Sequence, residues 1–210
     1  TFPQLEDTLI LKSREMYRDQ EHYNASNHVW SFPDGSRIRF GHLENDHAVY
    51  QYQSAEFDLI GFDELTQFTE VQYQYLLSRA RTTEVRQRVR IISCTNPGGE
   101  GNTWVMKRWA PWLDPTHDNP AKGGELRWFK RENSGVEIEA APDDPDAMSR
   151  TFIPARLADN PYLGEDYRKT LNLLPEPLRS QLLHGDWSSG LADGMFQLFP
   201  TAWVKEAMQR

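Results

Sequence analysis

Cysteine is almost absent from this sequence, since Cys94 is the only one among 210 residues. A single thiol excludes an intrachain disulfide and a cysteine-based zinc site. No stretch reaches the roughly 18 apolar residues that a membrane span needs. The first residues, TFPQL, lack the basic start and apolar run of a secretory signal. These absences predict a cytoplasmic, reducing setting. Because Cys94 ends the apolar run 89–94, we expect it to be buried.

Positive charge is also scarce, because 23 Lys and Arg face 31 Asp and Glu, for a net charge of -8. This balance argues against a protein that holds nucleic acid by bulk attraction to phosphate. Five arginines nevertheless lie close together in the chain: Arg79, Arg81, Arg86, Arg88 and Arg90. Both a local phosphate-facing patch and a solvated connection fit this cluster.

A phosphate-binding loop is missing as well. The glycine-rich segment GGEGNT at 98–103 lacks the Gly-Lys-Ser/Thr ending that supplies a lysine and a magnesium-binding hydroxyl. No other segment of the sequence supplies that ending. The chain also begins without a methionine, so we expect it to be a fragment.

Hydrophobic periodicity predicts helices alternating with strands, and hence an α/β fold with a mostly parallel sheet flanked by helices. The chain has 38% hydrophobic residues, enough to form a core. The predicted helices are 5–20, 69–81, 104–112, 164–174 and 176–184. The predicted strands are 57–62, 89–94, 125–130 and a hairpin of 28–32 with 37–40 around the turn sequence PDGS.

Polar residues follow the two apolar strands at 57–62 and 89–94. Asp63 and Glu64 come directly after the first strand, and Thr95 and Asn96 directly after the second. A helical crossover between them favours parallel strands, whose carboxyl ends meet at one edge of a sheet. We therefore expect these two pairs to be neighbours in space.

This arrangement suits ATP hydrolysis. In P-loop ATPases an Asp at a strand end binds Mg²⁺, and an adjacent Glu acts as general base toward water. Thr95 and Asn96 could sense the γ-phosphate. The plain alternatives are that the Asp63–Glu64 pair caps a helix and that TNPGG at 95–99 is a polar turn.

Two other places in the sequence have residues that could bind a metal ion. His42 and His47 lie near Glu44 and Asp46, a set that could bind a metal weakly but is typical of a polar surface. Asp186 could be a nuclease metal ligand. A turn that ends a helix, with Gly185 as its cap, is the simpler interpretation of that segment.

Several motifs in order resemble the large terminase subunit of tailed bacteriophages. They are TFPQL at 1–5, SFPDGSRIRFGH at 31–42, AEFDLIGFDELTQFTE at 55–70, SCTNPGG at 93–99, FIPARLADNPYL at 152–163 and LLHGDW at 182–187. In that family an N-terminal ATPase drives double-stranded DNA into the capsid, and a C-terminal nuclease cuts the concatemer. The resemblance covers nearly the whole chain.

The resemblance implies a role for each matching residue. Asp63 is similar to the Walker B aspartate that holds magnesium, and Glu64 to the catalytic glutamate. Thr95 and Asn96 are similar to the motif that couples hydrolysis to DNA movement. An arginine that completes a neighbour's site is also implied, and its candidates are Arg37, Arg39, Arg79 and Arg81.

The same resemblance implies the setting. It implies a partial P-loop NTPase domain at 1–154, a helical linker at 155–210, a Walker A loop upstream and a nuclease domain downstream. It also implies ATP and Mg²⁺ as cofactors, and DNA, the capsid portal, the small terminase subunit and further copies in a ring as partners. The implied location is the cytoplasm of a bacterial host. We expect no membrane partner, and we expect the chain alone to be inactive.

Two other functions stay open from the residues. One is a non-catalytic module that contacts capsid or DNA. The other is a fragment of a metal-dependent nuclease that uses Asp63, Glu64 and Asp186.

Overall fold

The structure is a computed structural model that describes residues 2–17, 22–83, 87–189 and 207. The chain divides into two compact units. Unit 1 comprises residues 1–60 and 71–90, and unit 2 comprises residues 61–70 and 91–210. The predicted boundary between an ATPase domain and a linker after residue 154 does not coincide with these divisions and stays a prediction.

Unit 1 begins with a helical segment and a small sheet. The helical segment is α1 (Phe2–Leu5), the π-helical η1 (Glu6–Ile10) and α2 (Leu11–Met16), and the antiparallel sheet is β1 (Tyr23–Asn24), β2 (Val29–Ser31) and β3 (Arg37–Arg39). The buried indole of Trp30 donates to Ser13 Oγ at 2.9 Å, which ties the sheet to the helix. The predicted hairpin is confirmed, and the Asp34 carboxylate accepts from Ser36 N at its turn. The 3-10 helix η2 (Asp46–Tyr52) follows.

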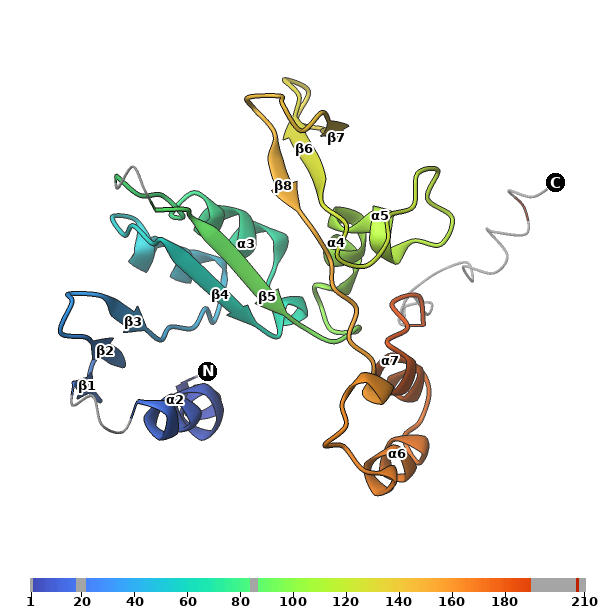
Figure 1. Cartoon of the computed structure of the whole chain (residues 1–210), viewed down its shortest axis with the longest axis horizontal. Coiled ribbons are helices and arrows are strands. Elements are labelled where there is room, and N and C mark those ends of the chain that lie inside the picture. Colours follow the sequence, from blue (N-terminus) through green and yellow to red (C-terminus); the bar gives the residue numbers. More distant parts are fainter. Residues whose placement is uncertain (1, 18–21, 84–86, 190–206, 208–210) are drawn as a thin grey trace. The chain divides into compact units, whose positions relative to one another are not determined.

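The two apolar strands predicted from the sequence are β4 (Leu59–Asp63) and β5 (Arg90–Cys94). They are hydrogen-bonded neighbours, and their arrows point the same way in Figure 1. Between them along the chain lie the short 3-10 helix η3 (Leu65–Gln67) and the helix α3 (Glu70–Leu77). The predicted parallel pair is therefore confirmed.

Alternate residues of these strands face different environments. Ile60 and Phe62 of β4 are buried, whereas Leu59 of the same strand is exposed. Cys94 shares the exposed face of β5 with Ile92, so the predicted burial of Cys94 is wrong. Strand periodicity placed it on the outward face, which an apolar run alone does not reveal.

Unit 2 continues with two short helices and a second antiparallel sheet. These are α4 (Asn102–Arg108) and α5 (Ala110–Leu113), then β6 (Arg127–Arg131), β7 (Glu137–Ala140) and β8 (Met148–Arg150) in the order β7-β6-β8. The predicted helix 104–112 is interrupted at Trp109, because Pro111 lacks an amide hydrogen and favours the start of a new helix. The predicted strand at 125–130 is β6.

The last described elements of unit 2 are helical. They are the 3-10 helix η4 (Leu157–Asp159), α6 (Glu165–Asn172) and α7 (Leu178–His184). Both helices predicted for this part are confirmed. Gly185 ends α7 in the left-handed conformation at φ 64°, as predicted for a glycine cap.

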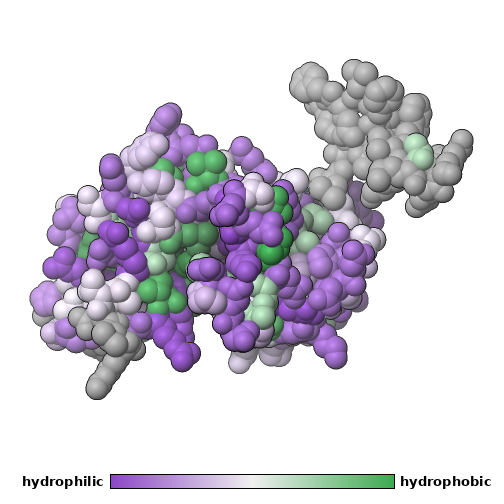
Figure 2. Space-filling model, turned by 90° about the horizontal axis from the view of Figure 1, so that it is seen from above, coloured by the Kyte–Doolittle hydropathy of each residue, from purple (hydrophilic) through white to green (hydrophobic). Residues whose placement is uncertain are grey.

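The mixed α/β class is confirmed, but a mostly parallel sheet is wrong for the residues that the structure describes. Both three-stranded sheets are antiparallel, and β4 with β5 forms the parallel pair. The reason is local, since tight turns at 32–36 and 132–135 join sequence neighbours into hairpins. Hydrophilic residues dominate the visible surface (Figure 2), and no described helix is long and apolar enough to cross a membrane.

Candidate functional site

The end of β4 leads into a strained residue. Asp63 is the last residue of β4, and Glu64 after it adopts the left-handed conformation with φ 54° and ψ 59°. This conformation costs a residue other than glycine about 1 to 3 kcal/mol, so contacts of the neighbouring residues must stabilise it. Leu65 and Thr66, which follow directly, are only 2% and 4% exposed. Strain of this kind is concentrated at functional sites.

Both carboxylates at this turn are available to a ligand. Asp63 is exposed and Glu64 partly exposed, and neither side chain makes a hydrogen bond or ion pair with the described residues. Glu64 is the N-cap residue of η3, and no side chain caps that helix. The capping alternative is therefore wrong for η3. Carboxylate oxygens are the ligands that Mg²⁺ prefers, so the donor set fits this ion.

Thr95, directly after β5, meets the turn that follows β4. Its Oγ1 lies 3.0 Å from Thr66 Oγ1 and accepts a hydrogen bond from Thr66 N at 3.2 Å. Thr66 Oγ1 lies within 3.3 Å of Asn96 O, and Thr95 Oγ1 within 3.0 Å of the same carbonyl. The predicted convergence of the two strand ends is confirmed.

Thr66 is the residue that sequence reasoning missed. It joins the strand ends, and it is buried, whereas Asn96 is exposed and contributes its carbonyl rather than its side chain. The only signal for Thr66 was its place two residues after Glu64, because nothing in its residue type distinguishes it from other threonines.

A glycine-rich loop, Gly98–Gly101, closes this arrangement from the β5 side. Gly101 N donates to Thr66 O at 2.7 Å. A Cβ on Gly101 would lie 2.6 Å from Phe68 O and 2.8 Å from Thr66 O, so a larger residue would push the two backbones apart. Glycine is therefore required here for close approach.

The four candidate arginines all belong to unit 1. Arg39 lies over the ring of Tyr52 at 5.1 Å, and Arg81 pairs with Glu56 at 3.0 Å. Arg79 donates to the Gln53 carbonyl and lies 5.4 Å from the centre of the Tyr75 ring. Arg37 is exposed and makes no ion pair with any described residue. Arg37 is thus the candidate with the freest guanidinium.

Comparison with known proteins identifies the family. The family model for the N-terminal part of the T4-like virus type of large terminase subunit matches residues 12–205. The chain belongs to this family. No curated protein and no solved structure gives a match. The resemblance inferred from the motifs is therefore confirmed.

The alternative metal sites of this terminase chain gain no support. His42 Nε2 lies 3.3 Å from Glu44 Oε1, but the described residues contain no group of three or more potential ligands. The Asp186 carboxylate accepts from Ser188 and Ser189, and the Ser188 hydroxyl is the main cause that holds the pKa of Asp186 below its usual value. Asp186 thus forms the turn after α7, as the simpler interpretation of that segment predicts.

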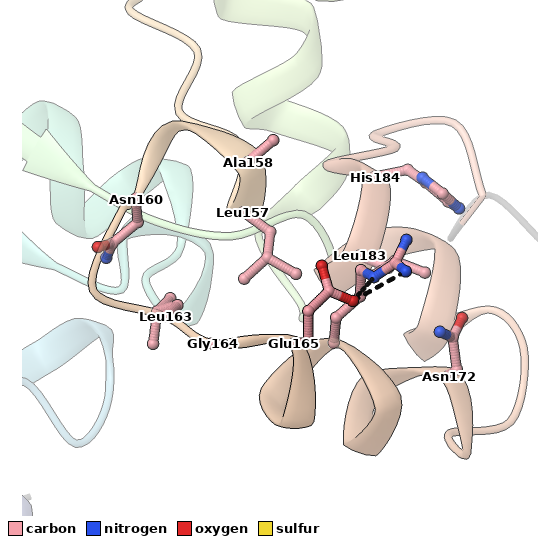
Figure 3. Close-up of a pocket in the computed structure, with 10 residues that line it drawn as sticks. Leu157, Ala158, Asn160, Leu163, Gly164, Glu165, Asn172, Leu183 and His184 are labelled. Carbon is pink, nitrogen blue, oxygen red and sulfur yellow. Dashed lines mark hydrogen bonds and ion pairs between the residues drawn. The ribbon is translucent and has the colours of Figure 1, made fainter.

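A separate pocket lies among η4, α6 and α7 of the terminase chain (Figure 3). It has a volume of about 630 Å³, and its lining includes Leu157, Leu163, Leu183 and His184. Glu165 and Arg168 form an ion pair of 3.0 Å beside it. None of the predicted site residues lines this pocket.

Proposed function

We propose that this terminase chain supplies the acidic side of an ATP-hydrolysing site, which drives double-stranded DNA into the capsid in the intact subunit. The observation that carries the proposal is the strained Glu64 beside the joined ends of β4 and β5, where the carboxylates of Asp63 and Glu64 have no partner among the residues that the structure describes. Family membership supports a role in DNA packaging.

The proposed roles follow from charge and position. Asp63 is a compact anion at a strand end and would bind Mg²⁺, which neutralises charge on the β- and γ-phosphates. Glu64 would take a proton from the attacking water. Asp63 ends β4 and Glu64 begins the turn into η3, and in the proposal the two carboxylates serve different atoms.

Thr95 and Thr66 would report the state of the γ-phosphate to the rest of unit 2. Each hydroxyl has one hydrogen to donate, and a phosphate oxygen would compete for it with the protein acceptor. Phosphate release would then return both hydroxyls to the bonds seen in the structure. Asn96, exposed beside them, would help to orient the water.

The other parts of the machine follow from the family. The proposal includes a partial P-loop NTPase fold, a phosphate loop from outside the present sequence, and a ring of copies in which one arginine acts on a neighbour's nucleotide. It also includes the capsid portal and the small terminase subunit as partners, in the cytoplasm of a bacterial host. Arg37 is the preferred trans-acting arginine, because the other three candidates have contacts within unit 1.

The test compares two aspartates in the intact subunit. Asp63→Asn removes the charge at the proposed metal site, so the Mg²⁺ concentration that gives half-maximal ATP turnover should rise by about tenfold or more. Asp58→Asn is the matched control, because Asp58 is also exposed and lies just before β4. Equal magnesium dependence in the two variants would contradict the role of Asp63 and favour the non-catalytic interaction module.

A further inference from the structure

The Gly98–Gly101 loop contacts the proposed hydrolysis site on one side. Gly101 N donates to the carbonyl of Thr66, two residues beyond Glu64, and a Cβ on Gly99 would lie 3.1 Å from the same carbonyl oxygen. A shift of η3 would therefore displace this loop directly.

The same loop contacts α7 on its other side. A Cβ on Gly98 would lie 2.7 Å from Oε1 of Gln181, a residue of α7 that is 7% exposed. Gly98 has φ 103°, a backbone that other residues rarely adopt. Both the close approach and the backbone angle require glycine, so the loop is fitted tightly to α7.

The amide group of Asn102 connects the Gly98–Gly101 loop to Trp187, which follows α7. It is 5% exposed, its Oδ1 accepts from Gly98 N at 2.8 Å, and its Nδ2 donates to the carbonyl of Trp187 at 3.3 Å. The same nitrogen lies 3.5 Å from Met106 Sδ. Trp187 is itself buried and packs edge-on against Phe152 at 5.9 Å.

We propose that Asn102 is a positioning residue that transmits movement of the hydrolysis site to the helical segment α6–α7. When a buried amide loses a hydrogen-bond partner, the structure is destabilised by the desolvation free energy of the group that is left without a bond. Gly98 and Trp187 are therefore held at a fixed separation through Asn102, and a displaced loop displaces the residues after α7. The inference rests on the proposed function, because the movement begins with a change of nucleotide state near Glu64.

Asn102→Asp tests this connection selectively in the intact subunit. The carboxylate still accepts from Gly98 N, but it has no hydrogen for the Trp187 carbonyl and repels it. Thr103→Asp is the matched control, because it adds the same charge one residue along α4 at an exposed position. The readouts are base pairs of DNA packaged per ATP hydrolysed, and hydrogen exchange of the amides in 178–187 with and without Mg-ATP.

The wild-type protein and Thr103→Asp should show the same packaging ratio and a nucleotide-dependent change in exchange at 178–187. Asn102→Asp should lower the ratio by about fivefold and abolish that change, while ATP turnover falls by less than the ratio. A merely structural role would lower turnover and packaging together and leave their ratio intact, which would overturn the inference.

A second variant covers the case in which Asn102→Asp does not fold. Asn102→Ala removes both bonds of Asn102 without adding a charge. It should also lower the packaging ratio, and an unchanged ratio would contradict the proposal. Failure of the proposed function has a different signature, namely ATP turnover that does not depend on Glu64 in the wild-type background.

Discussion

The hydroxyl oxygens of Thr66 and Thr95 lie 3.0 Å apart, although 29 positions separate the two residues in the sequence. This contact joins the residue after β5 to the turn after β4, two residues beyond Glu64. Thr66 is only 4% exposed, so its polar groups depend on the protein for their partners.

Thr66→Val keeps the shape of this side chain and removes its hydroxyl. The free energy of unfolding should fall by about 1 to 2 kcal/mol, because the bond to Thr95 Oγ1 is lost and the Asn96 carbonyl loses one of its two donors. Chemical denaturation measures this change. Thr103→Val, at an exposed position of α4, is the control and should change stability by less than about 0.5 kcal/mol.

The β4–β5 convergence was predictable from the sequence, and the details at its centre were not. Two short apolar runs separated by a helix imply parallel strands, which placed Thr95 near the Asp63–Glu64 turn. The role of Thr66 depends on the left-handed backbone of Glu64, and a glutamate in the sequence does not predict that conformation. The exposure of Cys94 was missed because composition alone does not show which face of a strand is covered.

The β6–β8 sheet was only partly predictable for a related reason. β7 (EIEA) and β8 (MSR) have only four and three residues, too few for an alternation of polar and apolar residues to stand out from the sequence. Their place is secured instead by ionic contacts. Arg108 Nη1 and Arg150 Nη2 lie 3.1 Å and 2.5 Å from Glu137 Oε1. The side chain of Glu137 is 27% exposed.

Glu137→Ala should therefore destabilise the protein by about 2 kcal/mol, because it leaves two partly buried guanidinium groups without their shared acceptor. The matched control is Glu165→Ala, whose ion pair with Arg168 is mostly exposed and contributes about 0.5 kcal/mol or less. Thermal and denaturant unfolding at neutral pH measure both variants. Equal losses would show that the Glu137 contacts add nothing beyond a surface pair.

The pH dependence of this effect has a defined sign. Burial alone raises the pKa of Glu137, but the hydrogen bond and charge of Arg150 and the charge of Arg108 outweigh it, so the pKa is lowered overall. The stabilisation is therefore complete above the ordinary glutamate pKa of 4.5 and is lost as the pH falls through the lowered value. The difference in unfolding free energy between the wild-type protein and Glu137→Gln should shrink at acidic pH.

The chain by itself should bind Mg-ATP weakly, with a Kd above about 100 μM. Most phosphate affinity of such sites comes from a cradle of backbone N–H groups and a lysine, and the sequence lacks a loop with the Gly-Lys-Ser/Thr ending. Isothermal titration calorimetry of the chain gives the answer, with the intact subunit as the reference. Low-micromolar binding by the chain would mean that another of its segments forms the cradle.

The central claim is that Glu64 activates the water that attacks ATP, and the single-turnover rate of ATP cleavage by Glu64→Gln in the intact subunit tests it most directly. An amide keeps the size of the side chain but cannot accept the proton, so cleavage of prebound ATP should slow by about a hundredfold or more while the Kd for ATP stays within about threefold. The rate is expressed per folded molecule, with the folded fraction taken from thermal melts. A wild-type cleavage rate in Glu64→Gln would contradict the account.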